Sequence, residues 1–187
     1  ASQASGASSR YKIRWKVVNP DQDRLRYRLR FRADGQALRR AMFTEDTTLT
    51  ATTYNWETGG VPDGWYRIEV EASDELDNPE DHSIRAATES EPVLIDNHAP
   101  RIEGLRFSRG EVSGRVRDAV GPISRLEYAV DGGAWRQLHS EDGILDTAEE
   151  SFRFGPLRLE PGSHIIAVRA ADHGANQITA ELEAVFR

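Results

Sequence analysis

The chain has 187 residues, enough for one or two domains of ordinary size. Its 24 Lys and Arg residues against 31 Asp and Glu residues give a net charge of −7, which argues against a dedicated binder of nucleic acid or anionic membranes. It has no cysteine, which excludes disulfides, thiolate metal sites and cysteine nucleophiles. No membrane-spanning apolar run and no signal peptide are recognisable. We expect a soluble, mostly β protein.

Three segments alternate apolar and polar residues, which predicts strands with one buried face. In residues 24–32 four apolar residues alternate with five arginines, and residues 11–17 and 66–72 show the same period of two. Turns rich in Pro, Gly and Asp separate the segments, and no long stretch has the apolar spacing of a helix. Many short strands with frequent turns are typical of antiparallel sandwiches.

The sequence repeats once. Residues 61–74 align with residues 159–172, and the aromatic residues at 54 and 56 align with those at 152 and 154 at the same spacing. A repeat of this length corresponds to one sandwich domain and is too long for a solenoid unit. We therefore predict an all-β protein with two antiparallel β-sandwiches in tandem: residues 1–10 form a flexible linker or tail, and 11–97 and 98–187 each form a sandwich.

The inward positions of the predicted strands define two cores, each large enough to fold without disulfides. The first is expected to contain Ile13, Trp15, Val17, Tyr27, Leu29, Phe31, Tyr54, Trp56, Ile68 and Val70, and the second Ile102, Leu105, Val112, Val116, Leu126, Tyr128, Phe152, Phe154, Ile166 and Val168.

Residues 62–74, Pro-Asp-Gly-Trp-Tyr-Arg-Ile-Glu-Val-Glu-Ala-Ser-Asp, resemble the end of a fibronectin type III domain. The resemblance implies that Tyr66 makes the corner hydrogen bond of that fold and that Trp15 lies on its second strand. Residues 15–27, 90–97 and 131–135 are also similar to the tandem fibronectin III or immunoglobulin-like modules that follow β-propellers in large exported bacterial proteins. The chain departs from the pattern at His164, which stands where a corner tyrosine is expected.

The first domain lacks an evident opening strand. Residues 101–107 and 111–117 are plausible first and second strands of the second domain, whereas only the linker-like residues 1–10 precede the strand that begins at Tyr11. The first domain therefore either does without this strand or receives one from elsewhere, since donor strands complete open sandwiches. Whether residues 1–10 pair as a strand stays open at this point.

The arginines of residues 24–32 allow two interpretations. Arg26, Arg28 and Arg30 are candidate contacts for phosphate, sulfated sugar or an acidic partner. In a fibronectin III sandwich, however, the third strand pairs with the strand that carries Glu69 and Glu71, and cross-strand ion pairs would then neutralise the row. We favour the ion-paired interpretation.

Two loops rich in carboxylates, at residues 21–23 and 74–81, are expected at one end of the first sandwich, where they could converge on calcium. Their spacing fits no EF-hand, and Asp96-Asn97 before a proline matches only a fragment of a cadherin-type calcium linker. We interpret these residues as solvated turns and assign no metal and no cofactor, although calcium binding stays open.

No catalytic site is predicted. The five histidines are scattered, and no nucleophile elbow, phosphate-binding glycine loop or dinucleotide motif occurs. Trp65 and Trp135 are the aromatic residues least clearly assigned to a core. They either cover a domain end or form a platform for sugar rings.

We thus expect a non-catalytic tandem module that serves as a spacer or as a protein-interaction or assembly module of an exported, extracytoplasmic bacterial protein. The alternative is a carbohydrate-binding module that uses Trp65 and Trp135. The expected partners are other domains of a parent protein or a protein partner, with self-association through the open edge of the first domain as one form. No nucleic acid and no membrane insertion are expected.

Overall fold

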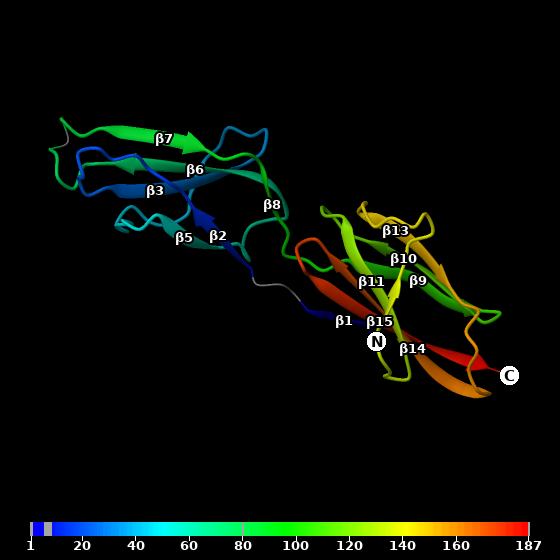
Figure 1. Cartoon of the computed structure of the whole chain (residues 1–187). Coiled ribbons are helices and arrows are strands. Elements are labelled where there is room, and N and C mark those ends of the chain that lie inside the picture. The colour runs from blue at the N-terminus through cyan, green and yellow to red at the C-terminus, as the bar shows by residue number, and fades with distance from the viewer. Residues whose placement is uncertain (1, 6–8, 80, 187) are drawn as a thin grey trace. The chain divides into compact units, whose positions relative to one another are not determined.

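The computed structural model of the chain describes residues 2–5, 9–79 and 81–186. These residues form fifteen strands, most of which are labelled in Figure 1. All sheets pair antiparallel, and the described residues contain no helix, so no helical membrane span is found among them. The contacts divide the chain into two compact units, Ser9–Ile95 and Asp96–Arg187 together with Ala1–Ser8. We call them the first and second sandwich. The fold class is therefore all-β, with two sandwiches in series.

The first sandwich has two sheets. The smaller sheet consists of β2 (Arg10–Arg14) and β5 (Thr53–Glu57). The larger sheet has the order β4 (Arg40–Ala41), β3 (Arg26–Ala33), β6 (Gly64–Ser73) and β7 (Arg85–Glu89), and β8 (Val93–Ile95) also pairs with β6.

The second sandwich follows the same plan with one more strand in its smaller sheet. That sheet has the order β13 (Glu149–Phe154), β10 (Glu111–Arg117) and β9 (Arg101–Ser108). The larger sheet has the order β1 (Ser2–Ser5), β15 (Gln177–Phe186), β14 (Gly162–Asp172), β11 (Ile123–Val130) and β12 (Arg136–Leu138).

The sequence leaves open whether residues 1–10 pair as a strand. In the structure Ser2–Ser5 form β1, which runs antiparallel to β15 at the edge of the larger sheet of the second sandwich. The backbone of this segment, for which composition predicts a linker, is therefore paired. Ser2–Ser5 pair with the second sandwich and not with the first.

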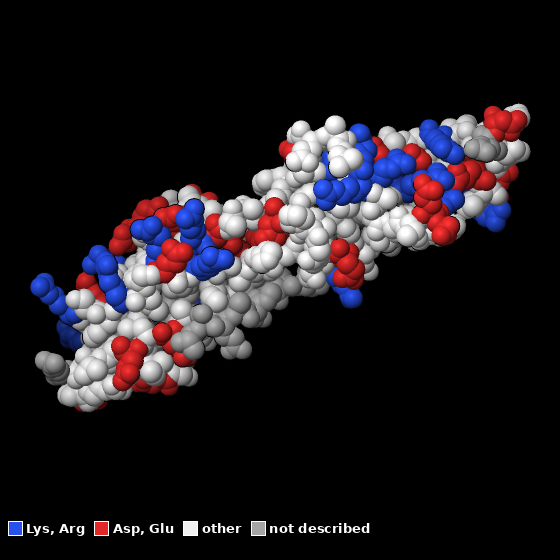
Figure 2. Space-filling view, turned by 180° about the vertical axis from the view of Figure 1, so that it is seen from behind, with Lys and Arg blue, Asp and Glu red and all other residues white. Residues whose placement is uncertain are grey.

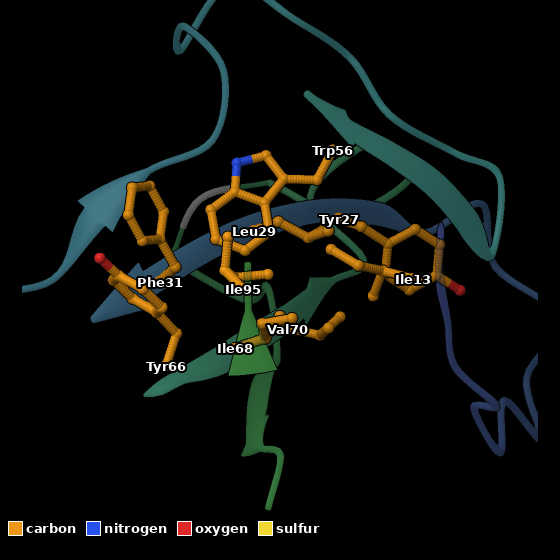
Figure 3. Packing of buried hydrophobic residues seen from close by; sticks show 9 residues of the cluster. All are labelled: Ile13, Tyr27, Leu29, Phe31, Trp56, Tyr66, Ile68, Val70 and Ile95. Atoms are coloured by element: carbon orange, nitrogen blue, oxygen red, sulfur yellow. The ribbon is translucent and has the colours of Figure 1, made fainter. Parts of the chain in front are cut away.

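The core of the first sandwich largely follows the alternation in the sequence. Figure 3 shows its buried side chains converging from strands of both sheets. Of the predicted residues, Trp15 and Tyr54 pack at its margin and Val17 is 41% exposed, so the prediction for Val17 is wrong. The reason is that β2 ends at Arg14, opposite the start of β5, and the following residues have no partner strand. The buried residues are Ile13, Tyr27, Leu29, Phe31, Trp56, Tyr66, Ile68, Val70 and Ile95.

In the second sandwich four predicted core residues, Ile102, Leu105, Tyr128 and Phe154, are only partly buried, and the other six are buried. Alternation alone does not identify some buried residues outside the clearest strands. These are Ile123, Leu138, Ala170, Ile178 and Ala184.

Each sandwich has the same corner before its long central strand. The Tyr66 hydroxyl donates to the carbonyl oxygen of Pro62 at 2.7 Å, and His164 Nε2 lies 2.9 Å from the carbonyl oxygen of Glu160. His164 therefore takes the place of the corner tyrosine, as predicted. The strand order and the corners identify both units as fibronectin type III-like sandwiches.

Candidate functional site

The edge of β2 that faces away from β5 pairs with no strand among the described residues. Ser9 accepts a backbone hydrogen bond from Thr58, and Trp15 donates one to Thr52, so the odd-numbered residues of this segment direct their backbone groups toward β5. Because these directions alternate along a strand, the N–H and C=O groups of Lys12 and Arg14 point to the free edge. These groups form a template to which another strand could add.

A groove of about 700 Å³ follows this edge and separates β2 from β7 and β8. The groove is lined by Tyr11, Lys12, Ile13, Arg14, Trp15, Ile68, Val70, Thr88, Glu89, Ser90 and Val93. Its apolar part belongs to the core cluster and its margin, so the interior of the first sandwich reaches the surface here. The indole Nε1 of Trp15 is buried with no hydrogen-bond acceptor among the described residues.

The same position in the second sandwich is filled by β9. The register with β5 and with β13 makes Lys12 equivalent to Ser113 and Arg14 equivalent to Arg115, because their partners are 98 residues apart. There β9 pairs with β10 along its whole length and also lies beside β15. The groove of the first sandwich is thus the place of a missing strand of the fold.

The outer face of the β2 segment is basic. Arg10, Lys12, Arg14 and Lys16 are all exposed. Arg10 is paired with Glu57 on β5, at 2.6 Å between Nε and Oε1. The ion pairs found among the described residues include none for the other three side chains, so this positive charge is not compensated locally.

The arginines of β3, unlike the basic residues of the β2 segment, are compensated by ion pairs. They are nevertheless the more conspicuous charge pattern in the sequence. Each of the candidate contacts Arg26, Arg28 and Arg30 is ion-paired with a glutamate that follows or lies on β6. Arg28 reaches Glu71 at 3.2 Å, and Arg30 reaches Glu69 at 3.1 Å, which confirms the predicted cross-strand pairs. Figure 2 shows basic and acidic atoms next to one another on the face it presents.

Electrostatics within this ladder favour the charged forms. Burial raises the pKa of Glu75, but hydrogen bonds from Arg28 and Arg26 hold it below its ordinary value. A hydrogen bond from Arg32 lowers the pKa of Glu89. The ladder is therefore a compensated network, and the arginines on it already have carboxylate partners.

The two candidate tryptophans are both exposed to solvent, Trp65 to 53% and Trp135 to 37%. Trp65 lies on β6 next to the inward Tyr66 and faces outward, as the alternation predicts. The guanidinium of Arg169 lies 4.1 Å from the centre of the Trp135 ring and covers one of its faces. The two residues belong to different sandwiches.

One group of carboxylates was not predicted, because its members are far apart in the sequence. Oxygens of Asp96, Asp118 and Asp172 lie within 4.8 Å of one another in the second sandwich, with Asp118 and Asp172 buried. Burial raises the pKa of Asp172, against hydrogen bonds from Asn176. These oxygens are of the kind that calcium prefers, but three carboxylates are fewer than its six to eight ligands.

The acidic loops of the first sandwich do meet, but through other contacts. Asn78 donates to Asp23 at 3.1 Å, and Arg24 pairs with Asp77 at 2.6 Å. The described residues of these loops include no group of three carboxylates within ligand distance. His164 lies 2.6 Å from Asp131, and this pair serves the corner described above.

No protein-family profile and no curated protein sequence matches the chain. Among solved structures, the chain is similar to the FN1-FN3 domains of chicken CNTN1, at 14% identity and a TM-score of 0.43 over 99% of this chain and 65% of that one. It thus spans less than two thirds of that structure. It is also similar to the chicken interferon gamma receptor alpha chain, at 11% identity and a TM-score of 0.40 over 99% of this chain and 96% of that one.

Proposed function

We propose that this chain is a non-catalytic protein-interaction module, which acts by accepting a β-strand at the free edge of β2. One observation carries this proposal: the groove beside β2 takes the place that β9 fills in the second sandwich. Strand addition uses main-chain hydrogen bonds for affinity and side-chain pockets for specificity. The first sandwich offers both, through the free backbone groups of β2 and the apolar lining of the groove.

The biological setting belongs to the same proposal. Two modules, residues 11–97 and 98–187, would form part of an exported bacterial protein outside the cytoplasm. The resemblance of residues 15–27, 90–97 and 131–135 to the modules that follow β-propellers supports this setting. A protein partner or another domain of the parent protein would then supply the strand, and without a partner the module would act as a spacer.

The test uses Lys12→Pro. Proline removes one backbone donor and obstructs strand addition, and it is tolerated on edge strands where the N–H faces away from the sheet. The mass in solution is measured by light scattering over a concentration series for the original chain and the variant. Oligomers that Lys12→Pro abolishes would show self-assembly through this edge, whereas a monomer at every concentration leaves a different partner or a spacer.

Hydrogen exchange tests whether the outer edge of β2 is unpaired in solution. The amides of Lys12 and Arg14 should exchange fast in the monomer, while those of Tyr11 and Ile13 should be protected by β5. Slow exchange at all four positions in a monomer would mean that the edge is already covered, and the proposal would then be wrong.

A carbohydrate-binding module is the second candidate, favoured by the exposure of Trp65. Exposed aromatic rings stack on sugar rings, and Trp65 has the larger exposed fraction of the two candidates. Tryptophan fluorescence across a glycan panel tests this. A change that Trp65→Ala removes would support it, whereas an unchanged spectrum across the panel counts against it.

A further inference from the structure

The occupant of the groove can be described by its chemistry, and this step rests on the proposed function. We infer that the free edge of β2 accepts an extended segment of a partner protein in which apolar side chains alternate with acidic ones. The segment runs antiparallel to β2, with its apolar side chains in the groove and its carboxylates on the outer face, beside Lys12 and Arg14.

The second sandwich supplies the template for the apolar positions. On β9, Ile102 lies opposite Val116 and Phe107 lies opposite Val112. Ile102, Leu105 and Phe107 are partly buried and pack against the two core clusters. In the first sandwich the equivalents of Val112 and Val116 are Tyr11 and Trp15, both of which line the groove. The pair of β9 and β10 has a bulge between Ser113 and Arg115, so an incoming strand without a bulge would present its apolar side chains at alternate positions.

The charge of the free edge of β2 determines which residues of the incoming strand alternate with its apolar residues. The ion pairs among the described residues leave Lys12, Arg14 and Lys16 without a carboxylate, whereas the arginines of β3 are matched by glutamates. In the second sandwich the residue of β9 opposite Arg115, the equivalent of Arg14, is Glu103. Opposite charges on facing residues stabilise a strand pair, and like charges destabilise it.

Residues 1–10 do not have this pattern. They contain no acidic residue, no aromatic residue and none of Val, Ile, Leu or Met, and Ser2–Ser5 are paired with β15. A second copy fits poorly as well. Its strands that alternate apolar and acidic residues are β6 and β15, and the apolar side chains of both already pack in the cores of their own sandwiches. A different protein segment is the occupant that these observations favour.

The experiment uses three synthetic ten-residue peptides: alternating Val and Glu, alternating Val and Lys, and alternating Ser and Glu. Binding to the full chain is measured by fluorescence anisotropy, and the site by hydrogen exchange at the amides of Lys12 and Arg14. We expect the Val-Glu peptide to bind and to protect both amides, the Val-Lys peptide to bind about tenfold or more weakly because two facing charge pairs become repulsive, and the Ser-Glu peptide not to bind.

Charge reversal provides the matched comparison. In the double variant Lys12→Glu and Arg14→Glu the preference should invert in favour of the Val-Lys peptide. The control variant, Arg101→Glu and Arg136→Glu, changes the net charge equally at exposed positions of the second sandwich and should leave the preference unchanged. Salt should weaken the binding of the Val-Glu peptide to the original chain.

The outcomes separate the two proposals. If the Val-Glu and Val-Lys peptides bind equally and Lys12→Pro abolishes both, strand addition holds and the acidic pattern is wrong. If the Ser-Glu peptide binds as well as the Val-Glu peptide, the contact is a surface charge effect and both proposals fail. If no peptide protects the amides of Lys12 and Arg14, the edge is not a strand acceptor.

Discussion

The smaller sheets of the two sandwiches differ by one strand, and that strand determines how completely each core is enclosed. In the second sandwich, where β9 is present, seven large apolar side chains are less than 2% exposed. Among the described residues of the first sandwich, only one large apolar side chain, Leu29, reaches that level. A two-stranded sheet leaves one side of the core open, because no third strand covers the space beside it.

The first sandwich differs from the second more in its ion pairs than in its aromatic packing, because close ring pairs also occur in the second, such as Tyr128 and Phe154 at 4.3 Å. Its core is rich in aromatic residues, with ring centres 4.6 Å apart for Phe31 and Trp56 and 5.0 Å apart for Trp15 and Tyr27. Across β3 and β6 it carries the ladder of arginines and glutamates. Comparison of the two sandwiches thus sets the contribution of a closing strand in the second against that of an arginine–glutamate ladder in the first.

The largest expected effect comes from the two cores. Phe152→Ala should destabilise the second sandwich by about 3–5 kcal/mol, because Phe152 is fully buried. Trp15→Ala should destabilise the first sandwich by less, about 2–3 kcal/mol, because the side chain is only partly buried and its N–H is unpaired. Denaturant unfolding of each variant measures both values. Equal losses would show that the groove does not weaken the packing around Trp15.

Proline at equivalent positions of the two second strands tests the edge directly. Ser113→Pro should cost about 1–3 kcal/mol, because it removes an N–H that faces β9 and leaves a backbone acceptor unpaired. Lys12→Pro should change the stability of the first sandwich by no more than about 0.5 kcal/mol, because its N–H faces the free edge. The two variants are compared by denaturant unfolding. A large loss for Lys12→Pro would mean that a strand already occupies the edge.

A fall in pH should lower the stability of the first sandwich through Glu75 and raise the stability of the second sandwich through Asp172. The lowered pKa of Glu75 means that its contribution is present above the ordinary value of 4.5 and is lost as the pH falls through the lowered one. The raised pKa of Asp172 means that stability is gained as the pH falls through the raised value toward 3.8.

Glu75→Gln should therefore make the stability of the first sandwich less sensitive to acid. Asp172→Asn should remove the stability that the second sandwich gains when Asp172 is protonated. The second sandwich of this variant should therefore lose stability more steeply as the pH falls. Hydrogen exchange within each sandwich, followed from about pH 7 to pH 3, measures both slopes. Unchanged slopes in either variant would contradict the assignment to that residue.

The smallest effect concerns the two corners. The hydrogen bond that the His164 ring donates to Asp131 raises the pKa of His164, so the contribution of this pair is complete below the ordinary value of 6.5 and is lost as the pH rises through the raised value. The Tyr66 corner has no histidine and should show no such loss. Thermal unfolding of His164→Tyr measures the difference. The variant should remove the loss above about pH 6.5, and a profile like that of the original chain would contradict this role.

Most of the fold could be predicted from alternation and repetition, because both record which side chains face the core. Two examples are the pairing of β3 with β6 and the corner at His164. The end of β2 could not be predicted, since it depends on where β5 begins and not on the apolar residue at Val17. The pairing of Ser2–Ser5 with β15 has no signal in a polar, apolar-poor segment.

The candidate site was only partly visible in the sequence. The missing first strand could be inferred by comparing the two halves, but the groove and the uncompensated charge of Lys12 and Arg14 require the three-dimensional neighbours. The arginines of β3 were the stronger signal, and their partners Glu69 and Glu71 neutralise them. Asp96, Asp118 and Asp172 come together only through the fold.

The charges of β3 also restrict which strands can meet while the chain folds. Neighbouring domains of similar topology can exchange strands during folding. The register that places β3 on β6 puts Glu69 and Glu71 opposite arginines. At the equivalent positions, 98 residues later, β14 carries Ala167 and Arg169, so a β3 strand misplaced onto the second sandwich would find no carboxylate and one like charge. The ladder thus favours the correct neighbour of β3 over the equivalent strand of the second sandwich.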